Sequence, residues 1–117
     1  MKGFLLVAHG SRLQSSNDEI IALGQKLSAG NDQFGWLDIA FLELTDPGVS
    51  LQIDTAVNAG ITELLIFPYF LAAGYHVQTD LPDLVDQARK RHPALQLTLM
   101  QHLGARDELV SLILQLC

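Results

Sequence analysis

Two kinds of hydrophobic pattern alternate along the chain. Four short and nearly continuous apolar runs are typical of β-strands that are covered on both faces. They lie at 4–8, 37–42, 64–67 and 95–100. Each is followed by a segment in which apolar residues recur at helical spacing and form one stripe. The stripes are Ile20, Leu23 and Leu27; Val49, Ile53 and Ala56; Leu81, Leu84, Val85 and Ala88; and Leu109, Leu112, Ile113 and Leu116. The pattern therefore predicts the order βαβαβαβα.

Residues that favour helix ends flank these stripes. Asp46 before Pro47 predicts an N-cap and a proline at the first helical position, where the missing N–H does no harm. Asp80, with Pro82 in the first turn, predicts the start of the third helix. Gly60 is expected to end the second helix in a left-handed conformation.

This alternation predicts a single α/β domain over 1–117. Parallel strands need right-handed crossovers, and the simplest doubly wound arrangement of four strands is flavodoxin-like, with the order 2-1-3-4 and helices on both faces. The length fits one domain, and the hydrophobic share of 49% is enough for one core. The longest apolar run, 64–75, falls short of the ~20 residues that cross a bilayer. No membrane span is expected.

Charge and cysteine content narrow the classes of partner. The formal net charge is −6 with only seven Lys and Arg, which argues against nucleic-acid binding because phosphates require a basic face. Cys117 is the only cysteine, so neither an internal disulfide nor a thiolate metal cluster is expected. The start of the chain lacks a secretory pattern, which favours a cytoplasmic location. Small molecules or proteins are the expected partners.

Three residues with metal-binding side chains follow the first three predicted strands. His9 follows the first, Glu43 the second, and His76 comes after the third. In the order 2-1-3-4 these strands are neighbours, about 4.8 Å apart, and their carboxyl ends form the rim of the ligand crevice. Two imidazoles and a carboxylate suit cobalt, nickel, iron or zinc, and three protein ligands leave positions open for a substrate.

Each of these residues also has a simpler interpretation. A single histidine at a strand end is more often a hydrogen-bonded loop residue than a metal ligand. The apolar loop 68–75 is long for a βα connection. It forms either a buried hydrophobic lobe or a pocket wall for a large flat apolar ligand, with Phe70 and Tyr75 in contact with that ligand. The sequence leaves both interpretations open.

The other two histidines carry less weight. His92 follows three basic residues at an expected helix end, where a histidine suits the helix dipole. His102 follows the fourth strand at the outer edge of the sheet, which leaves room for a peripheral role. Ser11 is most simply a turn or capping residue.

Several ordered motifs resemble one family. They are Leu5-Leu6-Val7-Ala8-His9-Gly10-Ser11-Arg12, Phe41-Leu42-Glu43 with Pro47, Pro68-Tyr69-Phe70-Leu71, Gly74-Tyr75-His76 and Asp80-Leu81-Pro82. Together they resemble the class II tetrapyrrole chelatases, in particular the small single-domain sirohydrochlorin cobaltochelatases of the CbiX/SirB type. The resemblance extends from Leu5 to about Gly104.

The resemblance implies an activity and its participants. Such a chelatase inserts a divalent metal, Co²⁺ or else Fe²⁺ or Ni²⁺, into sirohydrochlorin on a route to cobalamin, sirohaem or a nickel tetrapyrrole. Metal and tetrapyrrole are substrates, and no permanently bound cofactor is expected. His9, His76 and Glu43 would bind the metal and accept pyrrole protons, so alanine at either histidine should stop insertion and leave the fold intact. Larger relatives carry two such halves, which implies a homodimer here.

Binding of the substrate raises an electrostatic difficulty. Sirohydrochlorin carries eight carboxylates, whereas this chain is acidic. Arg12 is the residue expected to meet them, unless it is a solvated arginine of the first helical turn. Ser11, Phe70 and Tyr75 are the other expected substrate contacts.

Two rival functions belong to other classes. A non-catalytic metal or tetrapyrrole carrier would use the same residues without turnover. A histidine phosphatase-like phosphotransfer enzyme also has a His-Gly pair after its first strand, but Ala8 stands where that chemistry needs an arginine. Neither a GxGxxG nor a GxxxxGK[ST] nucleotide loop occurs.

Overall fold

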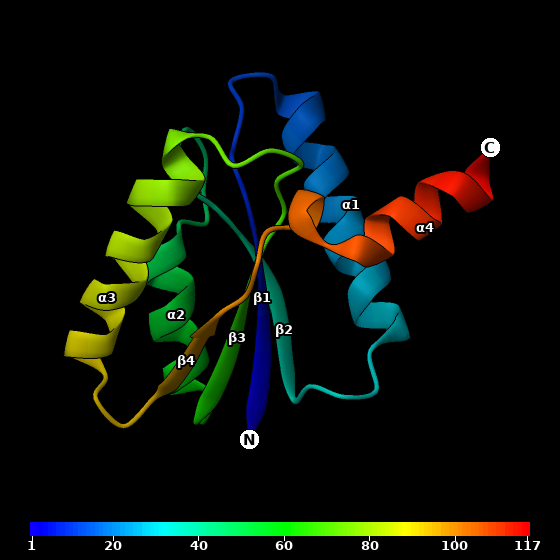
Figure 1. The fold of residues 1–117 in the computed structure, drawn as a ribbon. Coiled ribbons are helices and arrows are strands. Elements are labelled where there is room, and N and C mark those ends of the chain that lie inside the picture. Colours follow the sequence, from blue (N-terminus) through cyan, green and yellow to red (C-terminus); the bar gives the residue numbers. More distant parts are fainter.

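The computed structural model describes residues 1–117 except for the side chain of His76. Four parallel strands form one sheet in the spatial order β2-β1-β3-β4 (Figure 1). They are β1 (Lys2–Ala8), β2 (Trp36–Phe41), β3 (Glu63–Pro68) and β4 (Gln96–Leu99). The register pairs Ala8 with Phe41 and Val7 with Pro68. The predicted order is confirmed, and the carboxyl ends of β1, β2 and β3 lie at one edge.

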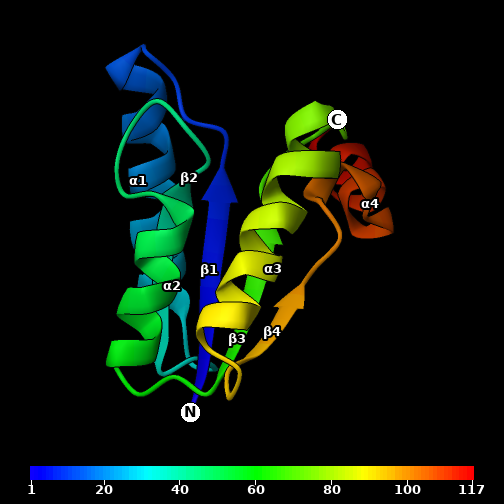
Figure 2. The ribbon, with the colours of Figure 1, turned by 90° about the vertical axis from the view of Figure 1, so that its left-hand side faces the viewer.

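Helices cover both faces of this sheet, as the sequence predicts. Figure 2 shows α2 (Val49–Asn58) and α3 (Leu81–Arg91) on one face and α1 (Gln14–Gly30) on the other. Because successive strand residues point to opposite faces, Leu5 and Val7 pack with α2 and α3, whereas Leu6 and Ala8 pack toward α1. Both faces of the central strand are therefore buried, which explains its uninterrupted apolar run.

The predicted start of the second helix is wrong. Asp46 is not the N-cap, since α2 begins at Val49 after Gly48. The Phe41 N–H donates to the Pro47 carbonyl at 2.8 Å, and Gly48 forms a bridge with Phe41. The segment after β2 thus forms a bent loop that returns to the end of the strand before the helix starts. The predicted end is confirmed, because Gly60 has φ +92° just after α2.

The third helix begins where the sequence places it, but without the expected cap. One turn of π-helix, η1 (His76–Asp80), leads directly into α3. Asp80 has helical backbone angles, and in the described contacts its side chain does not cap α3. A preceding helical turn takes the place of an extended N-cap residue here, and Pro82 lies in the first turn as predicted.

The fourth helix has the predicted stripe but does not cover the sheet. It follows a short 3₁₀ turn, η2 (Leu103–Ala105), and α4 (Asp107–Leu116) projects from the body of the molecule (Figure 1). Figures 1 and 2 together show that α4 lies apart from α1. All of α4 is described, and none of its residues is buried. Across the described residues, no helix is both long and apolar enough to span a membrane.

A charged cluster ties α2 to the end of α3, at the amino-terminal edge of the sheet. His92 Nε2 lies 2.6 Å from Asp54 Oδ1, and Arg91 donates to the same oxygen at 3.0 and 3.3 Å. The hydrogen bond with His92 is the largest cause that lowers the pKa of Asp54 below its ordinary value. Burial opposes this effect, and the hydrogen bond and charge of Arg91 add to the lowering. His92 is thus a structural residue far from the carboxyl edge.

This cluster predicts a pH-dependent contribution to stability. Since the pKa of Asp54 is lowered from 3.8, the stabilisation is present above that pH and is lost as the pH falls through the lowered folded value. Asp54→Asn should reduce the free energy of unfolding at pH 7 by at most about 1 kcal/mol, because the pair is partly exposed. Urea unfolding from pH 7 to pH 3 should show the difference closing below about pH 4. A difference that persists unchanged at pH 3 would contradict this.

Candidate functional site

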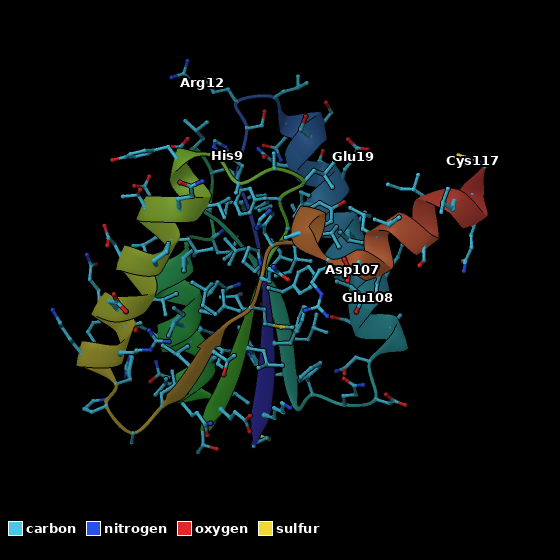
Figure 3. The ribbon with its side chains drawn as sticks, viewed as in Figure 1. His9, Arg12, Glu19, Asp107, Glu108 and Cys117 are labelled. Atoms are coloured by element: carbon cyan, nitrogen blue, oxygen red, sulfur yellow. The ribbon has the colours of Figure 1, made fainter. Side chains whose placement is uncertain are left out.

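His9 and Glu43 are brought together by backbone hydrogen bonds that continue beyond the ends of β1 and β2. Leu42 N–H donates to Ala8 O at 2.8 Å, and Glu43 N–H donates to His9 O at 3.1 Å. Their side chains meet at the carboxyl edge, with His9 Nε2 3.6 Å from Glu43 Oε1. The two side chains are 45% and 40% exposed, so both are accessible to a ligand. Figure 3 shows His9 above the sheet, between the loops of this edge.

Gly10 allows the loop that carries His9 and the loop that carries Glu43 to approach each other closely. It has φ +93°, and a Cβ atom built on it would lie 1.9 Å from the Glu43 carbonyl oxygen. A side chain there would face both an unfavourable backbone conformation and a backbone clash. The glycine of the His-Gly-Ser motif is therefore needed for the approach of the Glu43 loop to the His9 loop.

Phe70 supports His9 from the side of β3. Its ring packs edge-on against the imidazole, with centroids 6.2 Å apart and an interplanar angle of 82°. Phe70 is half-buried against the core, and its carbonyl accepts the Gly104 N–H at 2.9 Å. Phe70 therefore packs beside the histidine, and its expected contact with the substrate stays a prediction.

Exposed apolar side chains also lie in the loops at the carboxyl edge. We call this set the apolar rim: Leu13 before α1, Leu44 after Glu43, and Leu71 and Tyr75 in the loop after β3. Their exposed fractions run from 53% for Leu44 to 72% for Leu71. Leu44 also has φ +71°, which is rare for a residue with a branched side chain. The exposure of Leu71 and Tyr75 argues against a buried lobe and favours a wall for an apolar ligand.

Ser11 and Arg12 lie in the loop between His9 and α1. The Ser11 hydroxyl accepts the Leu13 N–H at 3.0 Å, which is the turn role that the sequence offered as its simplest interpretation. Arg12 is exposed at the tip of the loop, and its side chain points away from the body of the molecule (Figure 3). The substrate contacts expected of Ser11 and Arg12 stay predictions.

The surface next to Glu43 is acidic. An open hollow of about 360 Å³ is lined by Glu43 and Asp46, among others. A second hollow of about 280 Å³ shares Leu42 with it and is lined by Asp80 and Asp83. Carboxylates along these hollows raise the local concentration of divalent cations.

Of the three predicted metal ligands, the structure places the side chains of two. His9 and Glu43 meet, but the side chain of His76 lies outside the described residues, and its backbone begins η1. Among the described side chains, no three His, Cys, Asp or Glu groups gather as a metal site. His102 follows β4 at the sheet's outer edge, immediately before η2.

Asn17 is a residue of this site that the sequence analysis missed. It is 3% exposed, and its carboxamide makes two hydrogen bonds to the backbone of Ser11. The available signal was an asparagine in the first turns of an expected helix, where asparagine is a poor helix former and tends to bond nearby backbone instead.

Comparison with known proteins gives a family match over almost the whole chain. The model of the family described as CbiX matches residues 3–117. The sirohydrochlorin cobaltochelatase of Methanocaldococcus jannaschii is 30% identical over 92 residues, which are 79% of this chain and 64% of that protein. The sirohydrochlorin ferrochelatase of Bacillus subtilis is 25% identical over 96% of this chain and 42% of its own length.

Solved structures show the same fold. The sirohydrochlorin chelatase SirB from Bacillus subtilis subspecies spizizenii, in complex with cobalt, superposes with a TM-score of 0.87 at 25% identity. The match covers 97% of this chain and 48% of SirB. A putative cobalamin biosynthesis CbiX protein from Marinobacter aquaeolei superposes with a TM-score of 0.85 at 23% identity, over 99% of this chain and 93% of that one. This chain therefore spans about half of the SirB chain and under two thirds of these two curated relatives.

Proposed function

The chain belongs to the CbiX family, and from this premise we propose that it is a chelatase that inserts a divalent metal into sirohydrochlorin. The observation that carries the proposal is the His9–Glu43 pair at the carboxyl edge of β1 and β2. We propose Co²⁺ as the ion, because a 30% identical relative is named a cobaltochelatase; Fe²⁺ and Ni²⁺ suit the same ligands.

The proposed chemistry is an exchange of two protons for one metal ion. The tetrapyrrole loses its two pyrrole N–H protons as M²⁺ binds the four ring nitrogens. Neutral His9 binds the incoming ion and replaces part of its water shell, since imidazole suits borderline metals. Glu43, 3.6 Å from His9, accepts a released proton and passes it to solvent through its exposed face. His76 is the further ligand and base expected from the sequence.

The apolar rim supports a flat macrocycle as the second substrate. A tetrapyrrole offers an apolar face and a charged periphery. Leu13, Leu44, Leu71 and Tyr75 are exposed in the loops of the same edge as His9 and would lie against the face. The acidic hollows would repel the substrate's carboxylates and so favour binding with the periphery in solvent, while attracting the metal ion.

The test is metal insertion by the purified, metal-free chain. Sirohydrochlorin is mixed with Co²⁺, Fe²⁺ or Ni²⁺ under anaerobic conditions, and the absorbance change on metallation is followed with and without protein. We expect acceleration over the protein-free reaction, greatest with Co²⁺. Rates equal to the protein-free control with all three ions would refute the proposed function.

We also propose that the chain functions as a homodimer that pairs through α4. This ten-residue helix is shorter than the ~12–15 residues that an isolated helix needs in water, and its own chain buries none of its residues fully, so packing against a further surface would stabilise it. Its exposed apolar side chains are Val110, Leu112, Ile113, Leu114 and Leu116, each 49–77% exposed.

A second copy is the partner that fits these observations best. SirB is about twice as long as this chain and matches it with about half of its length, so a second copy would make up the missing length. The exposed side chains of α4 amount to an apolar patch on the order of a few hundred Å². Two-fold pairing would bury this patch on both copies and supply much of the ~800 Å² per partner of a standard interface.

Carboxylates introduced into the apolar stripe of α4 should dissociate the proposed dimer. We expect the wild type to have twice the 12.8 kDa mass of one chain in light scattering at tens of micromolar, and Leu112→Glu/Leu116→Glu to have the mass of one chain. Gln115→Glu adds a carboxylate to the same helix outside the stripe and should remain dimeric. A monomeric wild type, or a dimeric double variant, would contradict pairing through α4.

A further inference from the structure

The segment that carries His9 is poorly packed by apolar contacts. Between Ala8, the last buried residue of β1, and Asn17 in α1, all residues are exposed or only half-buried. A loop of this kind samples several conformations unless polar contacts fix it. Apart from the Phe70 ring beside the imidazole, the position of His9 therefore depends on hydrogen bonds to the loop backbone.

Two such sets of contacts hold the loop, one on each side of Gly10. On one side, His9 O accepts the Glu43 N–H at 3.1 Å. On the other, Asn17 holds both backbone groups of Ser11: Asn17 Oδ1 accepts the Ser11 N–H at 2.9 Å, and Asn17 Nδ2 donates to Ser11 O at 2.7 Å. Only Gly10 separates Ser11 from His9, so the second contact limits the rotation of the loop about Gly10.

A carboxamide is the group that this double contact requires. It has a donor and an acceptor side by side, whereas a carboxylate only accepts and an alkyl group does neither. Asn17 is also 3% exposed, so water cannot readily take over its role, and the bonds are stronger away from solvent. Its place on α1 anchors the loop to the rigid part of the fold.

We propose that Asn17 is a positioning residue, which holds Ser11 and thereby keeps the His9 imidazole at its place beside Glu43 for metal insertion. The inference rests on the proposed function for its kinetic consequence. The geometry of the loop can be tested without that function. Loss of an outer hydrogen bond that orients a metal-binding group typically costs 10–100-fold in affinity or activity.

The test compares two variants at position 17 with a matched control. Asn17→Ala removes both hydrogen bonds and leaves a void. Asn17→Leu also removes both hydrogen bonds but keeps a similar branched shape. If the void prevents folding of Asn17→Ala, Asn17→Leu still provides a folded variant. Gln52 provides the control, because it is also a buried carboxamide, 6% exposed, and donates to the Ile39 carbonyl at 2.7 Å away from the His9 loop. Gln52→Leu matches the chemistry of Asn17→Leu.

Two measurements are made on each folded variant. In NMR, we expect one sharp set of His9 ring signals and a slowly exchanging Ser11 amide in the wild type. Both position-17 variants should show broadened or shifted His9 signals and fast Ser11 exchange, and Gln52→Leu should match the wild type. The rate of Co²⁺ insertion should fall about 10-fold or more at position 17 and change less than twofold at position 52.

The outcomes distinguish this inference from the proposed function. If the wild type inserts no metal, the proposed function fails, and the NMR comparison still decides whether Asn17 positions His9. If Asn17→Leu is folded and keeps wild-type His9 signals and Ser11 exchange, the positioning role is refuted. The same conclusion follows if Gln52→Leu disturbs His9 and the insertion rate as much as Asn17→Leu does, because a general loss of stability then explains both.

Discussion

Replacement of His9 by alanine should reduce the rate of metal insertion at least about 100-fold while the fold is retained. Loss of a group that binds the metal and takes part in proton transfer typically costs 10²–10⁴ in rate. The side chain is nearly half exposed and lies beside Glu43 and Phe70, so its removal leaves no large cavity. The thermal midpoint should shift by only a few degrees. Absorbance-monitored insertion of Co²⁺, together with thermal unfolding, measures both effects.

His92→Asn is the matched control for the loss of an imidazole. His92 bonds Asp54 at the opposite edge of the sheet, so its replacement should change stability slightly and leave the insertion rate within about twofold. The sequence predicts a loss for His76→Ala as well. Full insertion by both His9→Ala and His76→Ala would refute the assignment of metal insertion to these histidines.

Gly10→Ala should damage both stability and activity. The added methyl group would lie 1.9 Å from the Glu43 carbonyl oxygen, and φ +93° is unfavourable for alanine. The conformational cost alone is about 1–2 kcal/mol, and relief of the clash must push the Glu43 loop away from His9. We expect a loss of about 2–3 kcal/mol in urea unfolding and at least a 10-fold lower insertion rate in the folded fraction.

Gly30→Ala separates this effect from a general effect of glycine replacement. Gly30 ends α1, and a Cβ atom there meets no atom within 4 Å. This variant should be as stable and as active as the wild type, or slightly more stable, because alanine favours helix. A Gly10→Ala variant that matches Gly30→Ala in both measurements would show that the two loops do not need their close approach.

Local patterns were sufficient to predict the sheet. The strands could be predicted from the sequence because β1 and its neighbours are covered on both faces. They therefore appear as continuous apolar runs between the helical stripes. Strand order then placed His9 and Glu43 at one edge, and the structure brings them within 3.6 Å. The substrate contacts of Arg12, Ser11, Phe70 and Tyr75 stay predictions.

Features that depend on contacts between residues far apart in the sequence could not be predicted from it. Asp46 and Pro47 have the local signature of a helix start, but a backbone hydrogen bond from Phe41 to Pro47 holds them in the loop beside β2, and the helix begins only at Val49. The α4 stripe predicted a helix correctly, while periodicity carries no information on what covers the stripe. The Asp54–His92 pair and the two bonds of Asn17 to Ser11 also join residues that no sequence spacing relates.

The most direct test of the central claim is the amount of metallated product formed per chain. Purified protein is mixed with a 100-fold excess of sirohydrochlorin and Co²⁺, and the product is quantified by absorbance after subtraction of the protein-free reaction. Catalysis predicts many equivalents of cobalt-sirohydrochlorin per chain, formed at a rate proportional to protein concentration. Product that stops at one equivalent or less would contradict a chelatase and indicate a carrier that binds metal or tetrapyrrole without turnover.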